Sequence, residues 1–377
     1  MKEKIKILIC SLPIKVKTFF TTIYTLINIK KSIYLSRIKR MNEDNFTELN
    51  TKRYKKNLKK CLTQFIISAN ETKQFIDYLY NDKIEIINDV EFNYDKPTII
   101  CVVKNEYKKL VNFFNHYNKL GDFNYLFIDN NSTDGTIELL KSNNVKIFLC
   151  KEKFSTLRKI TWINKVYSEI PENSWTILLD ADELLAYDEY ETIKFNDYLK
   201  ILEEKKIDVC GAIMVDFFPK NLTNSDDYIN EYKYFQNTFL ENKSYLFNSV
   251  YGGIREREFK YTNDRIFLIK KHPVVKKGRD TLLIHCHYIY PFERNIKSEI
   301  LIALLHYKLF NNEIQKYKKI AEEGSYGNGG GSKEYKMYLK KLTSDNFEDI
   351  FKFDKDTVEY RGTESLRKIK ILKNVFD

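Results

Sequence analysis

Carboxylate and amide side chains gather in three short segments, each of which follows an apolar run. The first segment is 104–106, the second is 129–135 and the third is 180–183. The third contains three acids in four residues directly after the run WTILL. Such carboxylates repel one another unless a cation lies among them, and their oxygens suit Mg²⁺ or Mn²⁺. We therefore expect Asp180 and Asp182 to bind a divalent cation.

The elements that must position these segments begin at Pro97, where apolar runs start to alternate with stretches of helical spacing. The expected strands are 98–103, 124–128, 145–149 and 175–179, and the expected helices are 106–120, 132–141 and 155–170. Strands separated by helices form βαβ units, whose parallel sheet is buried on both faces. Ligands bind such sheets beyond the carboxyl ends of the strands, where the polar segments lie.

Some of these residues also have a structural interpretation. Asn131 or Ser132 suits the cap of the helix that follows. Arg158 and Lys159, at the start of the third helix, either pair with phosphate oxygens or are solvated charges on an exposed turn. The acids of the third segment are harder to explain structurally, because carboxylates clustered at a sheet edge usually mark function.

Beyond Asp182 the alternation is less regular. Strands are expected at 208–218 and 281–289, helices at 295–309 and 334–342, and a mobile glycine-rich loop at 324–332. His285 and His287 lie two residues apart on an expected strand, so both side chains face the same side. They are either metal ligands or hydrogen-bonded core residues, whereas His116 and His306 are expected on helices in structural roles.

These motifs together resemble a known family. The segment from Pro97 to about Leu342 is similar to the glycosyltransferase family 2 enzymes of the GT-A fold, in the bacterial branch with an LDADE-type motif. The matching motifs are TIICVVKNE, LFIDNNSTDGT, RKITWINKVY, LLDADELL, MVDFFP, YGGIRER and LLHYKLF. The resemblance implies an α/β fold of GT-A (Rossmann-like) type, with a mixed sheet of mostly parallel strands. The expected domains are a basic, mostly helical extension (1–95), the GT-A domain (96–294) and a helical C-terminal region (295–377).

The resemblance also implies an activity. Such enzymes move a sugar from a nucleotide-sugar, here with a UDP-sugar favoured, to a glycan or lipid-linked glycan, and we expect inversion. The Lys-, Asn- and Ile-rich composition fits a bacterium that makes a surface polysaccharide. Mn²⁺ or Mg²⁺ at Asp180 and Asp182 would neutralise the leaving diphosphate, with His287, or else His285, completing the metal's ligands. The residues implied in donor binding are Asn105, Glu106, Asp129, Asn131, Asp134, Arg158, Lys159, Arg255 and Arg257.

Inverting transfer requires a base that takes the proton from the acceptor hydroxyl. In related enzymes this acid lies downstream of the metal motif, so Asp216 in MVDFFP and Glu256 in GGIRER are both candidates. The two cannot be separated from the sequence. A catalytically inactive GT-A protein is less consistent with the intact DADE motif.

Composition weighs against other classes of protein. The formal net charge of +11 suits an anionic partner, but the basic residues are dispersed and no nucleic-acid-binding motif is present. A nucleotidyltransferase or other phosphate-transfer enzyme is the alternative function. It would usually carry a glycine-rich phosphate loop after the first strand, and VVKNEYKK has no glycine.

The N-terminal segment and the cysteines bear on location. Six dispersed cysteines without a CxxC pair predict reduced thiols, and the longest uncharged stretch near the N-terminus, Thr18–Ile29, is 12 residues, too short to span a bilayer. Residues 1–40 carry ten basic residues and one acid. This composition favours either an anionic lipid surface or packing on the protein itself. We expect a cytoplasmic protein, peripheral on the inner face of the membrane if the first alternative holds.

Overall fold

The computed structural model describes most of the chain beyond the first 68 residues. The described residues are 69–220, 228–243, 248–259, 267–291, 293–308, 313–324, 330–343, 351–369 and 371–372. The expected lipid-binding segment, residues 1–40, lies outside this part of the chain, as does most of the expected N-terminal helical extension. None of the helices in the described ranges is long and apolar enough to cross a membrane.

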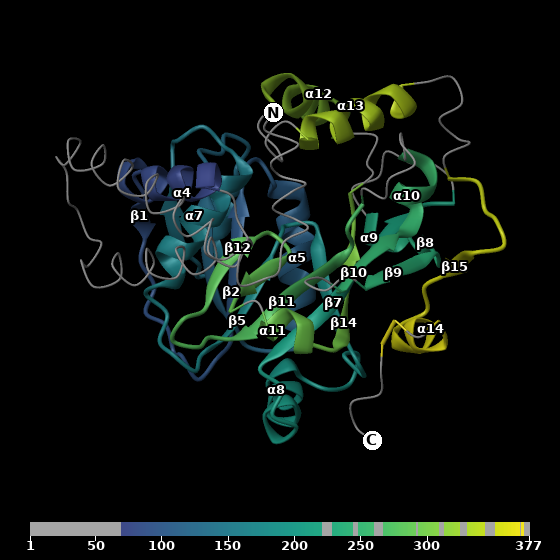
Figure 1. Ribbon diagram of the computed structural model, residues 1–377, viewed down its shortest axis with the longest axis horizontal. Helices are drawn as coiled ribbons and strands as arrows, with labels where there is room; N and C mark the ends of the chain where they lie inside the picture. The colour runs from purple at the N-terminus through teal and green to yellow at the C-terminus, as the bar shows by residue number, and fades with distance from the viewer. Residues whose placement is uncertain are drawn as a thin grey trace, which may run out of the picture.

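A large mixed sheet runs through the centre of the molecule (Figure 1), with the strand order β1-β4-β3-β2-β5-β11-β7-β14-β6. Its strands are β1 (Glu85–Asn88), β2 (Thr98–Val103), β3 (Asn124–Asp129), β4 (Lys146–Leu149), β5 (Trp175–Leu179), β6 (Glu183–Tyr187), β7 (Val209–Phe218), β11 (Lys270–Lys276) and β14 (Ile300–His306). Strand β8 (Tyr234–Gln236) pairs with β7, and β15 (Thr357–Glu359) pairs with β8. Two separate hairpins are β9 (Phe239–Lys243) with β10 (Asn248–Gly252), and β12 (Leu282–His285) with β13 (Tyr288–Tyr290).

Helices pack on both faces of this sheet. They are α4 (Ala69–Asn81), α5 (Tyr107–Leu120), α6 (Thr136–Ser142), α7 (Thr156–Tyr167), α8 (Phe195–Glu204), α9 (Tyr228–Glu231), α10 (Gly253–Phe259), α11 (Glu293–Lys297), α12 (Ile314–Glu323), α13 (Gly330–Leu342) and α14 (Thr363–Lys368). Figure 1 shows α12 and α13 lying across the top of the molecule, near the ends of several strands.

The first half of the sheet is the parallel array that the sequence predicts. Strands β4, β3, β2 and β5 are parallel neighbours, whereas β11 runs antiparallel to both β5 and β7. Val103 is in register with Asp129, and Cys101 is in register with Leu179. The three polar segments therefore leave the sheet at the same edge. The expected α/β fold with a mixed sheet is confirmed.

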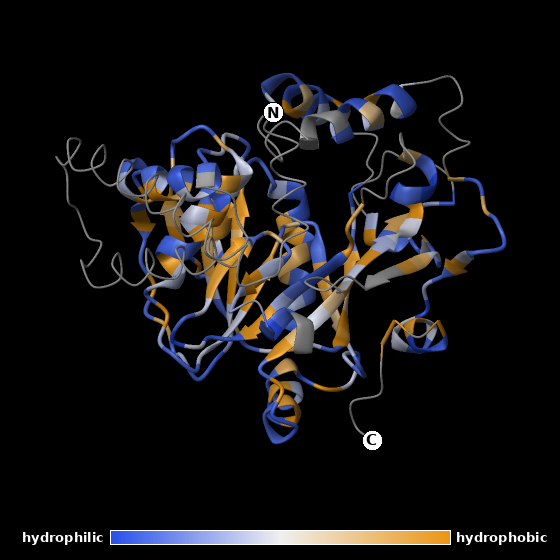
Figure 2. Cartoon of the chain, in the orientation of Figure 1, coloured by the Kyte–Doolittle hydropathy of each residue, from blue (hydrophilic) through white to orange (hydrophobic). Residues whose placement is uncertain are grey.

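Successive side chains on a strand face opposite sides of the sheet, so the sheet separates two apolar layers. On β2, Ile99 and Cys101 face the layer with α5, α6 and α8, whereas Ile100 faces the layer with α4, α7 and the β12-β13 hairpin. Figure 2 shows apolar residues concentrated on the strands and polar residues on the outer sides of the helices. Each fully buried aliphatic or aromatic side chain contributes roughly 1.5–3 kcal/mol. Burial on both faces makes the sheet a rigid support for the side chains at its edge.

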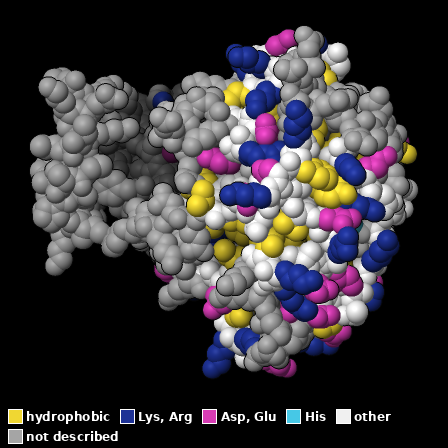
Figure 3. Space-filling model, turned by 90° about the vertical axis from the view of Figure 1, so that its right-hand side faces the viewer, with side chains coloured by type: hydrophobic (Ala, Val, Ile, Leu, Met, Phe, Trp, Pro, Cys, Tyr) yellow, Lys and Arg dark blue, Asp and Glu magenta, His cyan; other side chains and the backbone are white. Residues whose placement is uncertain are grey.

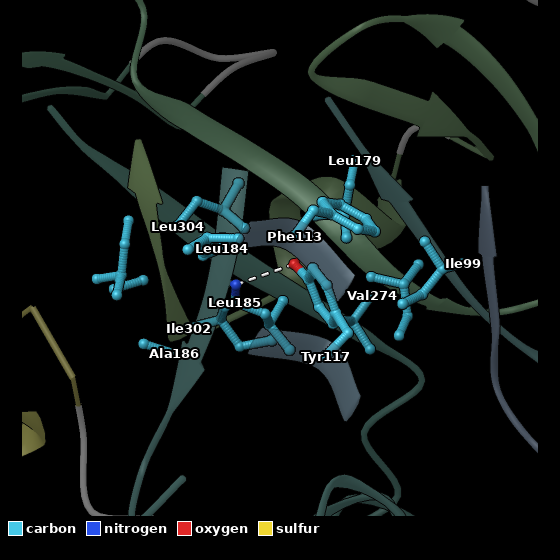
Figure 4. Close-up of a cluster of buried hydrophobic side chains, with 14 of the residues drawn as sticks. Ile99, Phe113, Tyr117, Leu179, Leu184, Leu185, Ala186, Val274, Ile302 and Leu304 are labelled. Atoms are coloured by element: carbon cyan, nitrogen blue, oxygen red, sulfur yellow. Dashed lines mark hydrogen bonds between the residues drawn. The ribbon is translucent and has the colours of Figure 1, made fainter. Parts of the chain in front are cut away.

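Side chains of α5 also provide hydrogen-bond partners for backbone groups on the outer edge of β6. The Tyr117 hydroxyl donates a hydrogen bond to Glu183 O at 3.0 Å. It also accepts a hydrogen bond from Leu185 N at 3.0 Å (Figure 4). The ring of His116 bonds to Leu185 O through Nε2 at 2.8 Å. Backbone groups on an edge strand need such partners when they are buried. These contacts fix the position of β6 directly after the acidic segment.

Several expected elements differ in the structure. Residues 300–306 form β14 inside the central sheet instead of a helix, so the sheet domain extends beyond the expected boundary at residue 294. The run ILIALLH is apolar throughout, and such a short run does not distinguish a buried strand from a helix. Strand β1 joins the sheet although it lies within the expected helical extension. Residues 330–332 belong to α13, not to the expected loop.

Candidate active site

The loops after β2 and β3 support each other. Asn105 Oδ1 accepts a hydrogen bond from Thr133 N at 2.8 Å, and Asn105 N donates to Ser132 Oγ at 2.9 Å. Asn105 (φ 54°) and Asn131 (φ 59°) adopt the left-handed backbone conformation, which asparagine tolerates better than most residues. The two expected donor-binding amides therefore lie in adjoining loops at the sheet edge.

Asp134 has a structural role in the same loops. Its carboxylate accepts hydrogen bonds from Tyr107 N at 3.2 Å, from Thr136 N at 3.1 Å and from Thr136 Oγ1 at 2.6 Å. These bonds tie the start of α5 to the start of α6, as capping groups do. The structure therefore favours capping over donor binding for Asp134.

Asp129 is fully buried at the end of β3 and carries an unsatisfied oxygen. Oδ1 accepts a hydrogen bond from Ser132 N at 2.8 Å, whereas Oδ2 has no hydrogen-bond partner among the described residues. Burial raises the pKa of Asp129, and the hydrogen bonds from Ser132 oppose this shift. An unsatisfied buried acceptor costs roughly 1–3 kcal/mol. A ligand that donates a hydrogen bond to Oδ2 would recover this cost.

Glu106 belongs to a buried network that joins the first strand end to α12. Lys316 Nζ lies 2.5 Å from Glu106 Oε1, and Lys109 Nζ lies 3.5 Å from Oε2. Lys109 Nζ also lies 2.9 Å from Glu313 and 3.7 Å from Asp182. Burial raises the pKa of Glu106 in spite of the two nearby lysines. Glu106 is therefore at the site, as one of the three carboxylates that surround Lys109.

Two lysines neutralise Asp180. Lys159 Nζ bonds to Oδ1, and Lys271 Nζ lies 3.2 Å from Oδ2 while also bonding to Glu183. Burial alone would raise the pKa of Asp180, but the two ammonium groups hold it well below its usual range. Lys159 thus lies at the strand ends, as expected. Both carboxylate oxygens of Asp180 are occupied by protein cations.

Asp182 faces a histidine from the second half of the chain. His306 Nε2 lies 3.8 Å from Asp182 Oδ2, and His306 Nδ1 donates to Asp216. Asp216 also accepts a hydrogen bond from Arg255 Nε at 2.7 Å. Burial would raise the pKa of Asp216, but Arg255 and His306 outweigh burial and lower it to about 2. Since Asp216 is ionised, His306 must carry the proton on Nδ1, which leaves Nε2 directed at Asp182 for binding.

This donor set fits a divalent cation with two protein ligands. A metal-binding histidine usually donates its other ring N–H to a carboxylate, and His306 does so to Asp216. Within the described ranges no group of three or more His, Cys, Asp or Glu side chains could hold a metal. The side chains that would hold a divalent cation here are Asp182 and His306, and substrate oxygens and water would complete its coordination. Both oxygens of Asp180, the other expected ligand, are paired with lysines in this arrangement.

His285 and His287 lie elsewhere than the sequence predicts. His285 is the last residue of β12 and His287 lies in the turn before β13, so they do not share one face of a single strand, and their ring centroids are 5.3 Å apart. His287 Nδ1 bonds to Lys270 O at 2.8 Å, and His285 contacts the thiol of Cys286. In the described part of the chain neither ring contacts Asp180 or Asp182. The expectation that His287 or His285 completes the metal's ligands is therefore not supported by this arrangement.

Two of the expected donor-binding arginines are paired with other groups of the protein. Arg158 contacts Asp82 at 3.2 Å and donates to Lys153 O at 2.9 Å, so it joins α7 to the preceding segments. Arg257 bonds to Gln236 at 2.6 Å and packs over the ring of Phe218. Both side chains are occupied in packing within the protein.

Arg255 and Glu256 lie on α10, after the glycine pair. Arg255 is buried and is held by Asp216. Glu256 is half-buried and accepts a hydrogen bond from Phe267 N at 3.5 Å. A Cβ at Gly252 would lie 1.7 Å from Thr238 O, so this glycine permits close approach of the protein's own backbone, not of a ligand.

Sequence reasoning missed several residues of the site. The apolar spacing predicts a helix at His306, and no sequence pattern marks Lys109, Lys271, Glu313 or Lys316. The spacing of LLHYKLF does not indicate that His306 ends a strand at the same sheet edge as Asp182. For Lys109, the sequence offers one indication: it lies three residues after Glu106, so the two side chains are neighbours if this segment is helical.

Comparisons with known proteins agree with this geometry over part of the chain. Residues 98–260 match the family model described as Glycosyl transferase family 2. This range includes the strand ends that carry Asp129, Asp180 and Asp182. Residues 98–260 are therefore similar to glycosyl transferase family 2, in agreement with the resemblance for that segment. No curated protein gives a significant match.

Solved structures give weak similarity. S. aureus TarS is 16% identical, with a TM-score of 0.27 over 34% of this chain and 23% of that chain. S. aureus TarS 1-349 in complex with UDP is 15% identical, with a TM-score of 0.25 over 34% of this chain and 37% of that chain. S. aureus TarS 1-349 is 11% identical, with a TM-score of 0.28 over 66% of this chain and 71% of that chain. The chain thus spans less than half of the first two of these proteins.

Proposed function

We propose that this protein is a metal-dependent glycosyltransferase that moves a sugar, with inversion, from a nucleotide-sugar to a glycan or a lipid-linked glycan in bacterial surface polysaccharide synthesis. The observation that carries the proposal is that the segment matching glycosyl transferase family 2 supplies Asp129, Asp180 and Asp182 to one sheet edge. Three carboxylates at one edge suit a polyhydroxylated, phosphorylated substrate better than a structural role.

The nucleoside is proposed to lie against the ends of β2 and β3. Asp129 Oδ2 is buried and unsatisfied, so it would accept a hydrogen bond from a ribose hydroxyl or a base N–H. The rigid loops that carry Asn105 and Asn131 would bound this part of the site. A UDP-sugar is the donor we propose first.

The diphosphate is proposed to lie between the lysine pair at Asp180 and the Asp182–His306 pair. Lys159 and Lys271 hold their positive charge because of Asp180, whose carboxylate raises the pKa of both lysines against the effect of burial. Bound Mn²⁺ or Mg²⁺, held by Asp182 and His306, would neutralise the charge that develops on the leaving nucleoside diphosphate. Asp216 orients His306 for this role.

Glu256 is the proposed base. A general base near neutral pH must accept a proton readily, whereas the pKa of Asp216 is about 2 and both of its oxygens already bind buried cationic or N–H groups. Asp216 is therefore a positioning residue in this proposal. Glu256 lies three residues from Gly253, whose Cβ position would be 3.3 Å from Asp216, so it is near the same edge.

The test is binding and turnover of UDP-sugars in the presence of Mn²⁺. We expect UDP to bind and Asp129→Asn to weaken its binding, while the exposed Asp122→Asn control does not. Asp182→Asn should abolish metal-dependent release of UDP. Failure of UDP and other nucleoside diphosphates to bind would contradict the proposed donor, full turnover in excess chelator would contradict the metal role, and release of pyrophosphate would indicate a nucleotidyltransferase instead.

A peripheral location on the inner face of the membrane is part of the proposal. It rests on the ten basic residues and one acid of residues 1–40, each Lys or Arg adding about 1 kcal/mol near an anionic surface. The test is co-sedimentation with vesicles. The full chain should pellet with anionic vesicles and not with neutral ones, and equal pelleting of a chain without residues 1–40 would exclude this role.

A further inference from the structure

A pocket of about 470 Å³ lies beside the candidate active site, along one side of α5. We call it the α5 pocket. Its walls are formed by α5, by β6 and β14, by residues 229–233 and by residues 359–361. Its volume lies within the range of small-molecule sites, roughly 300–1,000 Å³.

The α5 pocket shares structural elements with the active site. Leu184 of its lining lies two residues after Asp182, and Tyr307 N donates to Asp182 O at 3.0 Å. Asn112 lies one helical turn after Lys109 on the same face of α5. A chain-like molecule could therefore extend from the strand ends into this pocket along α5.

The surfaces of the α5 pocket are both apolar and polar. Leu184, Leu305 and Tyr307 are almost completely buried and form apolar surface. The hydroxyls of Tyr190 and Tyr360 lie 2.8 Å apart at its side. A sugar ring has an apolar C–H face and a hydroxyl edge, so tyrosine rings and hydroxyls placed together suit it.

His116 adds a hydrogen-bond acceptor. Burial lowers the pKa of His116 to about 4, so the ring is neutral near pH 7. Because Nε2 bonds to a carbonyl, Leu185 O, it must carry the proton. Nδ1 is then an acceptor, which is suited to a hydroxyl donor on a ligand.

The rim of the α5 pocket has a positive charge. Arg361 is paired with Glu359 at 2.6 Å, so these two charges cancel. Lys119 and Lys233 are exposed, and neither forms an ion pair within the described part of the chain. Two uncompensated ammonium groups beside hydroxyl-binding surface favour a saccharide that carries carboxylates.

We propose that the α5 pocket binds an acidic oligosaccharide, the extended part of the acceptor. This inference rests on the proposed function, because it treats the pocket as a continuation of a sugar-transfer site. Tyr190 and Tyr360 would contact ring faces and hydroxyls, and Lys119 and Lys233 would pair with uronic acid carboxylates. The pocket thereby selects the class of acceptor, while the strand ends select the donor.

The experiment is calorimetric titration of the full chain with hexagalacturonate, with maltohexaose as the uncharged comparison. Hexagalacturonate should bind more tightly than maltohexaose, and added salt should weaken it. Asn115→Trp, at an exposed position of the lining, should block both saccharides. Lys233→Glu should raise the dissociation constant for hexagalacturonate at least about 10-fold and leave that for maltohexaose nearly unchanged.

Matched controls use Lys141, which is exposed on α6 away from the pocket lining. Lys141→Trp and Lys141→Glu should leave both saccharides bound as in the parent protein. Absence of hexagalacturonate binding, or equal binding in Asn115→Trp, would overturn the proposal, and tighter binding of maltohexaose would overturn its acidic part. UDP affinity, measured on the same samples, should not change in any variant. A parent protein that binds hexagalacturonate but not UDP would refute the proposed donor and not the pocket.

Discussion

His306 and Asp216 form a buried hydrogen bond between neighbouring parallel strands, although 90 residues separate them in the chain. The bond ties the orientation of the imidazole to β7, and Arg255 fixes the second oxygen of the same carboxylate. Position and charge at the active site thus depend on a side chain that need not contact any substrate.

Asp216→Asn should destabilise the protein strongly. The substitution leaves the buried Arg255 without its anionic partner, and breaking a buried ion pair typically costs about 3–5 kcal/mol. Because the pKa of Asp216 is lowered to about 2 in the folded state, its stabilisation is present above about pH 4 and is lost as the pH falls towards 2. Urea unfolding at pH 7 and pH 3 checks this, and the exposed Asp122→Asn is the control. An equal loss of stability at both pH values would contradict the assignment.

His306→Gln should weaken metal binding far more than His287→Gln does. His306 Nε2 faces Asp182, whereas His287 is engaged with Lys270 O. We expect the affinity for Mn²⁺, titrated in the presence of UDP, to fall at least about 10-fold in the first variant and to change little in the second. Equal effects of the two substitutions would contradict the preference for His306 over His287 as the metal ligand.

Glu256→Gln should reduce sugar transfer about 100-fold, the usual scale for loss of a general base, and leave UDP affinity intact. Donor hydrolysis by water, measured in parallel, reports whether the donor site is intact. Glu256→Asp is the comparison that keeps the carboxylate. Transfer near the parent rate in Glu256→Gln would exclude this residue as the base.

His116→Gln should change how stability depends on pH. The folded pKa of about 4 lies below the ordinary value of 6.5, so the unfolded state binds the proton first and stability falls as the pH drops from about 6.5 to 4. The variant should lose about 2 kcal/mol less than the parent protein between pH 7 and pH 5. Guanidinium unfolding at the two pH values measures the difference. His272→Gln tests the same effect at a second buried histidine, whose pKa burial also lowers to about 4.

The parallel half of the fold was predictable from the sequence because its signals are local. Apolar runs of strand length and the helices between them appear in order from Pro97, and the polar residues after each run mark the strand ends. The ends of β2, β3 and β5 therefore meet where expected. Asp129, Asp180 and Asp182 needed no information from the second half of the chain.

The rest of the site depends on pairings between distant residues. His306 reaches Asp182 only because β14 inserts between β7 and β6, and an all-apolar run gives no sign of that partner choice. Glu313 and Lys316 reach Lys109 and Glu106 across more than 200 residues. Charged side chains at such separations look like ordinary solvated groups in the sequence.

The net charge of the sequence also says little about how charges are distributed on the surface of the folded protein. Figure 3 shows Lys and Arg side chains interspersed with Asp and Glu side chains on one face of the molecule, not gathered into one positive area. Total charge constrains the partner only when the charges share a surface.

The insertion of β14 also sets an order of events during synthesis. In the described part of the sheet β6 pairs only with β14, so residues 183–187 have no strand to join until residues 300–306 have left the ribosome. Contacts between residues so far apart in the sequence form slowly, and strand edges that stay unpaired in the meantime promote aggregation. The acidic segment at 180–183 enters directly into β6. The nascent chain should therefore form the loops after β2 and β3 early and the Asp182–His306 pair last, so the candidate active site is complete only after nearly the whole sheet has been assembled.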